Sequence, residues 1–454
     1  MDDIRTIIRN FVPQNRKSVK RTDNQSQFDA LRKEFSVFTF EKQTVKREDG
    51  RLSIVFEFNL DDRYLFHPTI EIPARPFLEW DSIPTEMLEA MAFQIGMTEL
   101  VSYWKIACPK RVEIKAFSLT ESQKRFWKKL YYNGLGEFLY LNGISVSEED
   151  LMMVDSVGNQ PFAKVSLPLA ERTLIPVGGG KDSVVTLECL RNEMPVIPLI
   201  VNPRGATLNC VKTANFGENE FVVINRTLDP TMLKLNAEGY LNGHTPFSAL
   251  LAFISVLVAF GSRSKYIALS NENSANEATV PGTNINHQYS KSIGFERDFR
   301  DYVEENLNGK VQYFSFLRPL SELQIAYLFA QFEAYHHVFR SCNVGSKTDS
   351  WCGRCPKCLF TWLVLSPFLP KEKLVAIFGK DLMADESLRP VFEELDGTAS
   401  VKPFECVGTV EEVRACMEAA NGHREAVENI LHRFNDEHFL PGEFGRILKR
   451  RLHV

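Results

Sequence analysis

The first third of the chain alternates apolar and polar residues, which is the pattern of strands that bury one face. Alternation is strict from Leu52 to Leu60, and another strand-like run covers Phe35 to Phe40. Between them, Asp49-Gly50 favours a tight turn joining antiparallel strands. The apolar spacing then becomes helical from Leu88 to Ile95. We predict an α+β N-terminal domain, residues 1–170, which is a candidate for substrate binding.

From residue 171 onward, short apolar runs are separated by helical segments, a pattern typical of a parallel sheet in an α/β fold. The predicted strands are Leu174 to Val177, Val196 to Val201, Phe221 to Ile224 and Tyr266 to Ser270. Ligands of such sheets bind beyond the carboxyl ends of the strands, so the loops after Val177, Val201 and Ser270 are expected to converge on one crevice. We predict a catalytic domain, residues 171–454, that ends in a helical extension.

The longest apolar run, Ala249 to Phe260, predicts a buried helix, because about a dozen residues are too few to cross a bilayer. The 454 residues carry a formal net charge of −5, which gives no overall attraction to nucleic acid or to anionic membranes. Met1 to Arg5 carry acid where a secretory signal carries base, and no apolar core follows. We therefore expect a cytoplasmic protein with no nucleic-acid or membrane partner.

A glycine-rich loop follows the first strand of the predicted parallel sheet. Its glycines allow backbone N–H groups to surround a phosphate, and the N-terminus of the helix that follows favours negative charge. Lys181 adds a positive charge, and the carboxylate of Asp182 can hold a metal ion. We name this segment the phosphate loop; it consists of Val177, Gly178, Gly179, Gly180, Lys181, Asp182 and Ser183.

Two better known phosphate-binding loops do not fit this segment. A Walker loop requires Ser or Thr directly after its Gly-Lys, where Asp182 stands, and a dinucleotide loop requires a third glycine where Ser183 stands. An ordinary glycine-rich turn is the bland alternative, and the Lys-Asp-Ser that follows the glycines argues against it. The favoured interpretation is a site for the pyrophosphate part of ATP.

Four of the nine cysteines are spaced as metal ligands. Two-residue gaps allow successive cysteines to bind one ion, and Gly353 and Pro356 permit the tight turns that this requires. This spacing favours zinc over an iron–sulfur cluster or free thiols. Four thiolates leave no position for water on the ion, so we predict that the site is structural. The predicted ligands are Cys342, Cys352, Cys355 and Cys358.

Three loops on the predicted ligand-binding edge of the sheet are rich in polar residues. They cover Leu241 to Pro246, Ser270 to Glu277, and Asn286 to Ser292. Each alone could serve only for helix capping or solvation, but three such loops on one edge favour a site. Together with a later cysteine they supply the candidate residues Asn271, Glu272, Glu277, His244, His287, Tyr289, Lys291 and Cys406.

The phosphate loop resembles the S-G-G-x-D-S signature of the PP-loop ATP pyrophosphatases, with Gly178 in place of the first serine. Together with the cysteines it is similar to the 7-cyano-7-deazaguanine synthases, which have a four-cysteine zinc site but no extension like residues 1–170. Further stretches resemble the UDP-N-acetylmuramoyl-L-alanyl-L-glutamate epimerase family over nearly the whole chain. They are Tyr131 to Glu137, Leu241 to Phe247, Asn286 to Ser292 and Lys402 to Thr409.

The epimerase resemblance implies inversion of the terminal L-Glu of UDP-MurNAc-L-Ala-L-Glu, a peptidoglycan precursor, through an acyl-adenylate that releases AMP and pyrophosphate. It also implies ATP and Mg²⁺ as cofactors beside structural Zn²⁺, and a functional pairing with an L-Glu-adding muramoyl ligase. The expected fold is that of the PP-loop (adenine nucleotide alpha hydrolase-like) proteins. The alternative is a ligase of the deazaguanine type, which transfers nitrogen to an adenylated carboxylate.

The resemblance also suggests residue roles. The phosphate loop would bind pyrophosphate, while Val201 and Asn202 end the strand that usually meets adenine in this fold. Asp182 would hold Mg²⁺ with Glu272 or Glu277. Inversion requires a base on one face of the carbon and an acid on the other, and groups that titrate near neutrality suit both, so the histidines are the first pair. The catalytic candidates are Asp182, His244, His287 and Lys291, with Tyr289 and Cys406 as rivals and Asn271 as a substrate or Mg²⁺ candidate.

Overall fold

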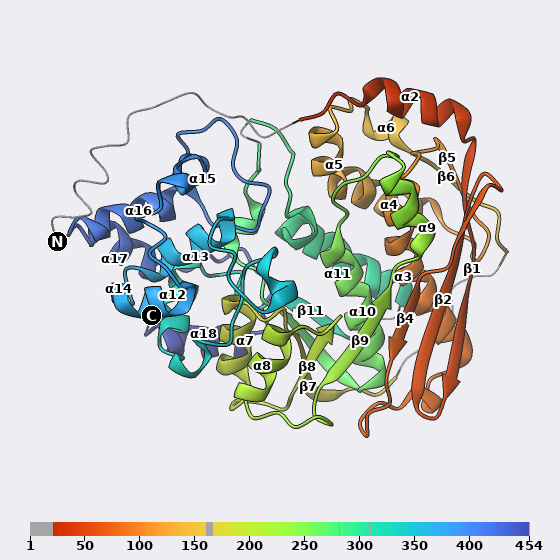
Figure 1. Cartoon of the computed structure of the whole chain (residues 1–454). Coiled ribbons are helices and arrows are strands. Elements are labelled where there is room, and N and C mark those ends of the chain that lie inside the picture. Colours follow the sequence, from red (N-terminus) through yellow and green to blue (C-terminus); the bar gives the residue numbers. More distant parts are fainter. Residues whose placement is uncertain (1–20, 160–166, 281, 308–309, 454) are drawn as a thin grey trace.

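A computed structural model describes residues 21–159, 167–280, 282–307 and 310–453. One large mixed sheet organises this α/β protein, with strand order β11-β10-β7-β8-β9-β4-β2-β1-β5-β6 and with β3 paired to β2. Figure 1 shows the N-terminal strands in red at one end of the sheet and the C-terminal helices in blue at the other end. The two ends of the sheet are built differently.

The N-terminal end contains the predicted hairpin. Strands β1 (Val37–Glu48) and β2 (Arg51–Leu60) pair antiparallel. Asp49 and Gly50 both have positive φ, 49° and 71°, as the tight turn between such strands requires. The hairpin prediction is confirmed. The sheet continues through β3 (Tyr64–Phe66), β4 (Thr69–Ile72), β5 (Arg111–Ile114) and β6 (Met153–Ser156), of which β5 and β6 run parallel to β1.

Helix α3 (Thr85–Trp104) fills the core on one face of this hairpin. It includes the predicted helical segment and is buried along nearly its whole length. Gly96 allows the close approach, because a Cβ there would lie 2.3 Å from Cζ of Phe40. The other described helices of this part are α2 (Gln25–Glu34), α4 (Glu121–Gly134), α5 (Gly136–Leu141) and α6 (Glu148–Leu151).

The predicted parallel strands are present and adjacent. Strands β7 (Ala170–Pro176), β8 (Val196–Val201), β9 (Val222–Thr227), β10 (Ser264–Leu269) and β11 (Gln312–Ser315) all run parallel. Their helices are α7 (Lys181–Leu190), α8 (Gly205–Thr213), α9 (Pro230–Ala237), α10 (Phe247–Gly261) and α11 (Ile293–Leu307). This part of the fold class is confirmed.

The antiparallel and parallel parts form one sheet, whereas the sequence pattern suggests two. Strand β4 pairs antiparallel with β9, with Glu71 opposite Asn225. Two further contacts connect the parts. Glu99 of α3 forms an ion pair with Arg226 of β9, and α10 packs against both α3 and β10. The boundary at residue 170 stays a prediction, because the sheet crosses it without interruption.

Helix α10 matches the predicted buried apolar helix. Among the described residues, no helix is long and apolar enough to span a membrane. The C-terminal helices form a cluster beside the parallel strands (Figure 1), and the first and last of them contact α7. They are α12 (Glu322–Ala330), α13 (Pro356–Leu365), α14 (Lys371–Phe378), α15 (Arg389–Leu395), α16 (Val410–Ala420), α17 (Glu425–Leu431) and α18 (Gly442–Leu452).

Candidate active site

The phosphate loop connects β7 to α7 and is held close to the chain around it. Gly179 has φ +80°, and a Cβ there would lie 2.8 Å from the backbone N of Thr207. Its carbonyl accepts a hydrogen bond of 2.8 Å from the N–H of Arg340. At Gly180 a Cβ would lie 2.9 Å from Oγ of Ser341. Side chains are therefore excluded at these two positions, while Gly178 has open space around it.

A cavity of about 610 Å³ lies at the carboxyl ends of the parallel strands. The loops after Val177, Val201 and Ser270 all line it, as the strand pattern predicts. Asn202 and Asn271 stand beside those strand ends and also line the cavity. The other lining residues that matter below are Gly178, Gly180, Lys181, Asp182, Ser183, Lys291, Glu322 and Cys406. One wall therefore contains the phosphate loop and another contains an amine and a thiol.

Three carboxylates converge beside the phosphate loop. Oxygens of Asp182, Glu272 and Glu322 lie within 4.8 Å of one another. Both glutamates are 3% exposed, and burial raises the pKa of each carboxyl group. Lys181, also 3% exposed, forms ion pairs with Asp182 and Glu322. The ammonium groups of Lys181 and Lys291 both act on these three carboxylates, so the group carries an excess of negative charge when all three are ionised.

This donor set fits a divalent cation. Mg²⁺ prefers oxygen ligands and is usually held by one or two carboxylates together with phosphate oxygens. Among the described residues, the carboxylate of Glu272 accepts a side-chain hydrogen bond only from the hydroxyl of Ser274, at 3.3 Å. The predicted alternative, Glu277, lies outside this group; it pairs with Lys402, and its side chain is 41% exposed. Asp182, Glu272 and Glu322 are the residues that would hold the ion.

A chain of five polar side chains leads away from the cavity. Nζ of Lys291 donates to Sγ of Cys406 over 3.0 Å, and the side chain of His287 hydrogen-bonds the same thiol. Nδ1 of His287 lies 2.5 Å from a carboxylate oxygen of Glu137, and Nδ1 of His244 lies 3.5 Å from that oxygen. We name these residues the Lys291–His244 chain. Within it, Lys291 and Cys406 line the cavity.

The two histidines have opposite pKa shifts. Burial and the neighbouring His287 lower the pKa of His244 to about 4. Burial also disfavours the charged form of His287, but hydrogen bonds with Cys406 and Glu137 outweigh it and raise the pKa to about 9. At neutral pH, therefore, one imidazole is a potential acceptor of a proton and the other a potential donor. Their ring centroids are 4.5 Å apart, because both approach the same oxygen of Glu137.

A fully buried arginine fixes the two loops that carry these groups. Nη1 of Arg318 donates to the carbonyl of Glu272 over 2.6 Å, and Nη2 donates to the carbonyl of Lys291. Nη2 also pairs with the carboxylate of Glu296 at 3.2 Å. The position of Glu272 relative to Lys291 is thus set by one guanidinium group.

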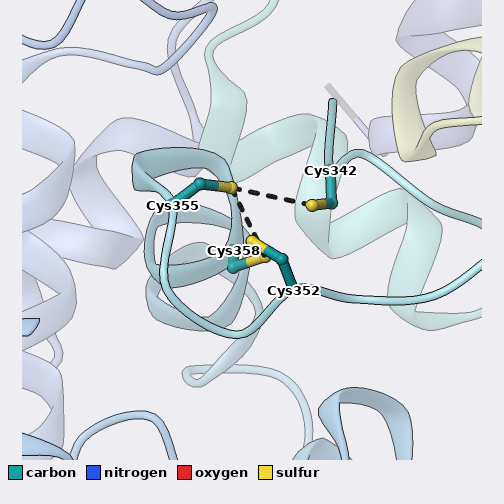
Figure 2. A group of neighbouring side chains, drawn as sticks. All are labelled: Cys342, Cys352, Cys355 and Cys358. Carbon is teal, nitrogen blue, oxygen red and sulfur yellow. Dashed lines mark hydrogen bonds between the residues drawn. The ribbon is translucent and has the colours of Figure 1, made fainter. Parts of the chain in front are cut away.

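The four cysteines of the predicted zinc site converge (Figure 2). Sulfur–sulfur distances are 3.7 Å for Cys342 and Cys355, 3.7 Å for Cys352 and Cys358, and 3.5 Å for Cys355 and Cys358. Tetrahedral zinc with Zn–S bonds of about 2.3 Å requires sulfur–sulfur distances of about 3.8 Å. The thiols therefore fit zinc. Cys342 also lines the cavity, so this cluster forms part of its wall.

Local sequence explains the shape of the cluster. Gly353 has φ +64°, and Cys355 is the N-cap of α13, with Pro356 at the first position of that helix. Proline is favoured there because its missing N–H costs no hydrogen bond. The backbone N–H of Gly345 donates to Sγ of Cys342 over 3.1 Å.

Comparison with known proteins decides the family. Residues 29–316 match the model of the MurL N-terminal domain, and residues 338–438 match that of the MurL C-terminal domain. The chain belongs to the MurL family. A UDP-N-acetyl-alpha-D-muramoyl-L-alanyl-L-glutamate epimerase of Xanthomonas oryzae pv. oryzae is 33% identical over 410 residues, covering 88% of this chain and 89% of the relative.

Two further relatives carry the same epimerase name. The protein of Micromonospora sp. is 36% identical over 389 residues, with 83% of this chain and 84% of the relative covered. That of Salinispora tropica is 35% identical over 395 residues, with 83% and 82% covered. No solved structure was found to match the chain.

Within this member of the MurL family, the structure brings most of the predicted residues together. Tyr289 is an exception, since it packs against the hydrophobic core and its ring centroid lies 6.2 Å from that of Phe295. Three functional candidates were not predicted as such: Glu322, Glu137 and Arg318. Ser321 and Gln324 form a capping box that explains why Glu322 begins a helix. Glu137 lies in a stretch that carries the family resemblance, but nothing in the sequence pattern connects it with the histidines.

Proposed function

We propose that this chain inverts the terminal L-Glu of UDP-MurNAc-L-Ala-L-Glu to D-Glu after adenylating its α-carboxylate with ATP, and that it releases AMP and pyrophosphate. Membership of the MurL family supports the substrate. The observation that carries the mechanism is the shared cavity, because the phosphate loop, two of the three carboxylates and the Lys291–Cys406 pair all line it. A PP-loop fold is proposed with it, on the order of the parallel strands and the position of the loop.

Inversion explains the use of ATP. A free carboxylate makes the neighbouring α-proton very weakly acidic, since its removal would place a second negative charge next to the first. Conversion to an acyl-adenylate neutralises the carboxylate and provides a carbonyl that can accept the charge of the carbanion. Hydrolysis of the activated group afterwards explains why AMP accompanies a product that differs from the substrate only in handedness.

The nucleotide would lie along the strand ends. The backbone around Gly179 and Gly180 and the N-terminus of α7, ten residues long, would bind pyrophosphate, with Ser183 adding a hydroxyl. Val201 and Asn202 are proposed to meet adenine. Bound Mg²⁺ would neutralise phosphate charge. Asp182, Glu272 and Glu322 would hold it, and Lys181 would balance the carboxylates that remain.

Proton exchange at the α-carbon is assigned to the Lys291–His244 chain. His244 and His287 remain the first pair because of their opposite pKa shifts, with Lys291, which lines the cavity together with the phosphate loop, as a further candidate. Glu137 would hold both imidazoles. Because Glu137 belongs to residues 1–170, this contact supports a substrate-binding role for the N-terminal part. The substrate itself requires a ligase that adds L-Glu to a UDP-muramoyl precursor.

One incubation tests the proposal. Purified protein is mixed with UDP-MurNAc-L-Ala-L-Glu, ATP and Mg²⁺ in D₂O, and the glutamate of the hydrolysed product is analysed by chiral chromatography and mass. We expect deuterated D-Glu with stoichiometric AMP. AMP that forms only when ammonia is added, with no D-Glu, would replace the proposal by the nitrogen-transferring alternative. Failure to form either product would contradict both.

The metal assignment has its own test. Asp182→Asn should abolish substrate-dependent exchange of labelled pyrophosphate into ATP, because the carboxylate nearest the loop is lost. Asp298→Asn is a matched control, since Asp298 pairs with Lys129 away from the cavity. Full exchange in Asp182→Asn would contradict the assignment.

A further inference from the structure

Cys406, which is half-buried, differs from the buried cysteines outside the four-cysteine cluster in the described part of the chain. Burial raises the pKa of Cys189 and Cys210 to about 12, and it raises that of Cys416 as well. Burial acts in the same direction on Cys406, but Lys291, Lys357 and His287 outweigh it and lower the pKa well below the ordinary value. The thiolate form of Cys406 is thus favoured by its surroundings: its sulfur lines the cavity and accepts a hydrogen bond of 3.0 Å from the ammonium group of Lys291.

Such a thiolate is better suited to attack carbon than to remove a proton from it. Neighbouring cations that stabilise the anion make it a weak base, whereas the nucleophilicity of a thiolate falls much less than its basicity. The electrophile would be close at hand, because the phosphate loop that is proposed to hold the adenylate lines the same cavity. Covalent catalysis of this kind divides one difficult step into two easier ones.

On the basis of the adenylation proposed above, we infer that Cys406 takes the glutamyl group from AMP as a thioester and that inversion occurs on this thioester, with Lys291 and His287 as the proton-transfer groups. Both residues are hydrogen-bonded to the thiol in the free enzyme. An acyl group on the sulfur would therefore lie next to a potential base and a potential acid. In this inference Lys291 replaces His244 as the partner of His287 in proton transfer, and His244 and Glu137 act as positioning residues for His287.

The steps balance as follows. The thiolate attacks the acyl carbon, a C–S bond forms, and the C–O bond to AMP breaks with its electron pair leaving on the phosphate. Acylation removes one of the negative charges that Lys291 faces, so its buried ammonium group loses a proton more readily, to a phosphate oxygen of the departing AMP. The neutral amine takes the α-proton, and the imidazolium of His287 delivers one to the resulting enolate. Water then cleaves the C–S bond, which regenerates the carboxylate and the thiolate and releases two protons. One of them restores the imidazolium of His287, and the other leaves to solvent.

The experiment separates this step from adenylation. Wild-type enzyme is given UDP-MurNAc-L-Ala-L-Glu, ATP and Mg²⁺, quenched in acid within milliseconds to seconds, and analysed by intact mass and peptide mapping. We expect an adduct equal to the substrate minus water on Cys406, which neutral hydroxylamine removes. Cys406→Ala should retain pyrophosphate exchange into ATP but lose the adduct and about 10³-fold or more of D-Glu formation. Cys416→Ala, outside the cavity, should form the adduct normally.

Each other result is decisive. Pyrophosphate exchange in the wild type with no adduct at any quench time, or inversion by Cys406→Ala within tenfold of the wild type, overturns the thioester and leaves adenylation standing. Lack of substrate-dependent exchange in the wild type overturns adenylation and the thioester together. If Cys406→Ala does not fold, wild-type enzyme alkylated at Cys406 by iodoacetamide replaces it. The alkylated enzyme must keep exchange and lose inversion, and inversion by it overturns the inference.

Discussion

The antiparallel and parallel ends of the sheet use their buried volume in different ways. Around the hairpin, the interior is built from aromatic rings in contact, with the centroids of Phe40 and Phe58 4.9 Å apart and those of Phe58 and Tyr103 5.5 Å apart. At the carboxyl ends of the parallel strands, the interior holds Lys181, Glu272 and Glu322, each 3% exposed. Burial of apolar side chains therefore stabilises the antiparallel end, whereas burial of charged side chains destabilises the parallel end.

Buried charge is costly even when it is paired, because the attraction between partners repays only part of the lost hydration. Three carboxylates near two ammonium groups, those of Lys181 and Lys291, are not fully paired. A protein would gain from a neutral replacement there, unless the charge binds something that the fold alone does not need. The two ends should consequently respond to mutation with opposite effects on activity and on stability.

Loss of the zinc site should have the largest effect on the parallel end. Here buried thiols contribute stability only through the ion, and structural zinc is worth many kcal/mol. Cys355→Ser, or prolonged treatment with a strong chelator, should lower Tm by about 10 °C or more. Thermal melts with metal analysis provide the measurement. Cys416→Ser is the control, as a buried cysteine outside the cluster, and its metal content should be unchanged.

Glu272→Gln should separate activity from stability most clearly. Burial raises the pKa of this carboxyl group, so its ionised form opposes folding at neutral pH, and the neutral amide should raise Tm. If Glu272 holds Mg²⁺ as proposed, the same substitution should reduce AMP formation by about 10²-fold or more. Glu277→Gln is the matched control, because Glu277 pairs with Lys402 outside the carboxylate group. Reduced stability with normal activity in Glu272→Gln would contradict the view that this buried carboxylate serves activity at the expense of stability.

Phe58→Ala should give the opposite result at the antiparallel end. Phe58 is 0% exposed, and its removal leaves a cavity, which costs about 3–5 kcal/mol of unfolding free energy. The rate per folded molecule, measured well below the melting temperature, should stay within about twofold of the wild type. Urea titration gives the stability. Leu65→Ala in the neighbouring strand β3, where Leu65 is 51% exposed, should change it little.

Features set by neighbouring residues could be predicted from the sequence, whereas features that join distant residues could not. Local periodicity identified the hairpin, α3, α10 and four of the parallel strands, because each is defined by neighbouring residues. The pairing of β4 with β9 joins Thr69 to Thr227, and no short-range pattern specifies it. Spacing alone identified the four cysteines, since adjacent ligands share one ion. Glu322, by contrast, has the sequence context of an ordinary helix start, and its role depends on where α12 places it.

The phosphate loop is expected to show the smallest effects, because two adjacent glycines differ in their surroundings. A Cβ at Gly178 would meet nothing within 4 Å, whereas Gly179 has positive φ and contacts Thr207 and Ala206. Gly179→Ala should therefore cost about 1–3 kcal/mol from backbone strain and lose most pyrophosphate exchange.

Gly178→Ser introduces the residue that the PP-loop signature has at this position. We expect its KM for ATP and its exchange rate to stay within about threefold of the wild type, since the hydroxyl enters open space beside the proposed pyrophosphate site. Steady-state kinetics of both variants provide the measurement. A loss in Gly178→Ser as severe as that in Gly179→Ala would mean that ligand, rather than chain, occupies the space around Gly178. In that case the absence of a side chain there is a requirement of the substrate and not a neutral departure from the signature.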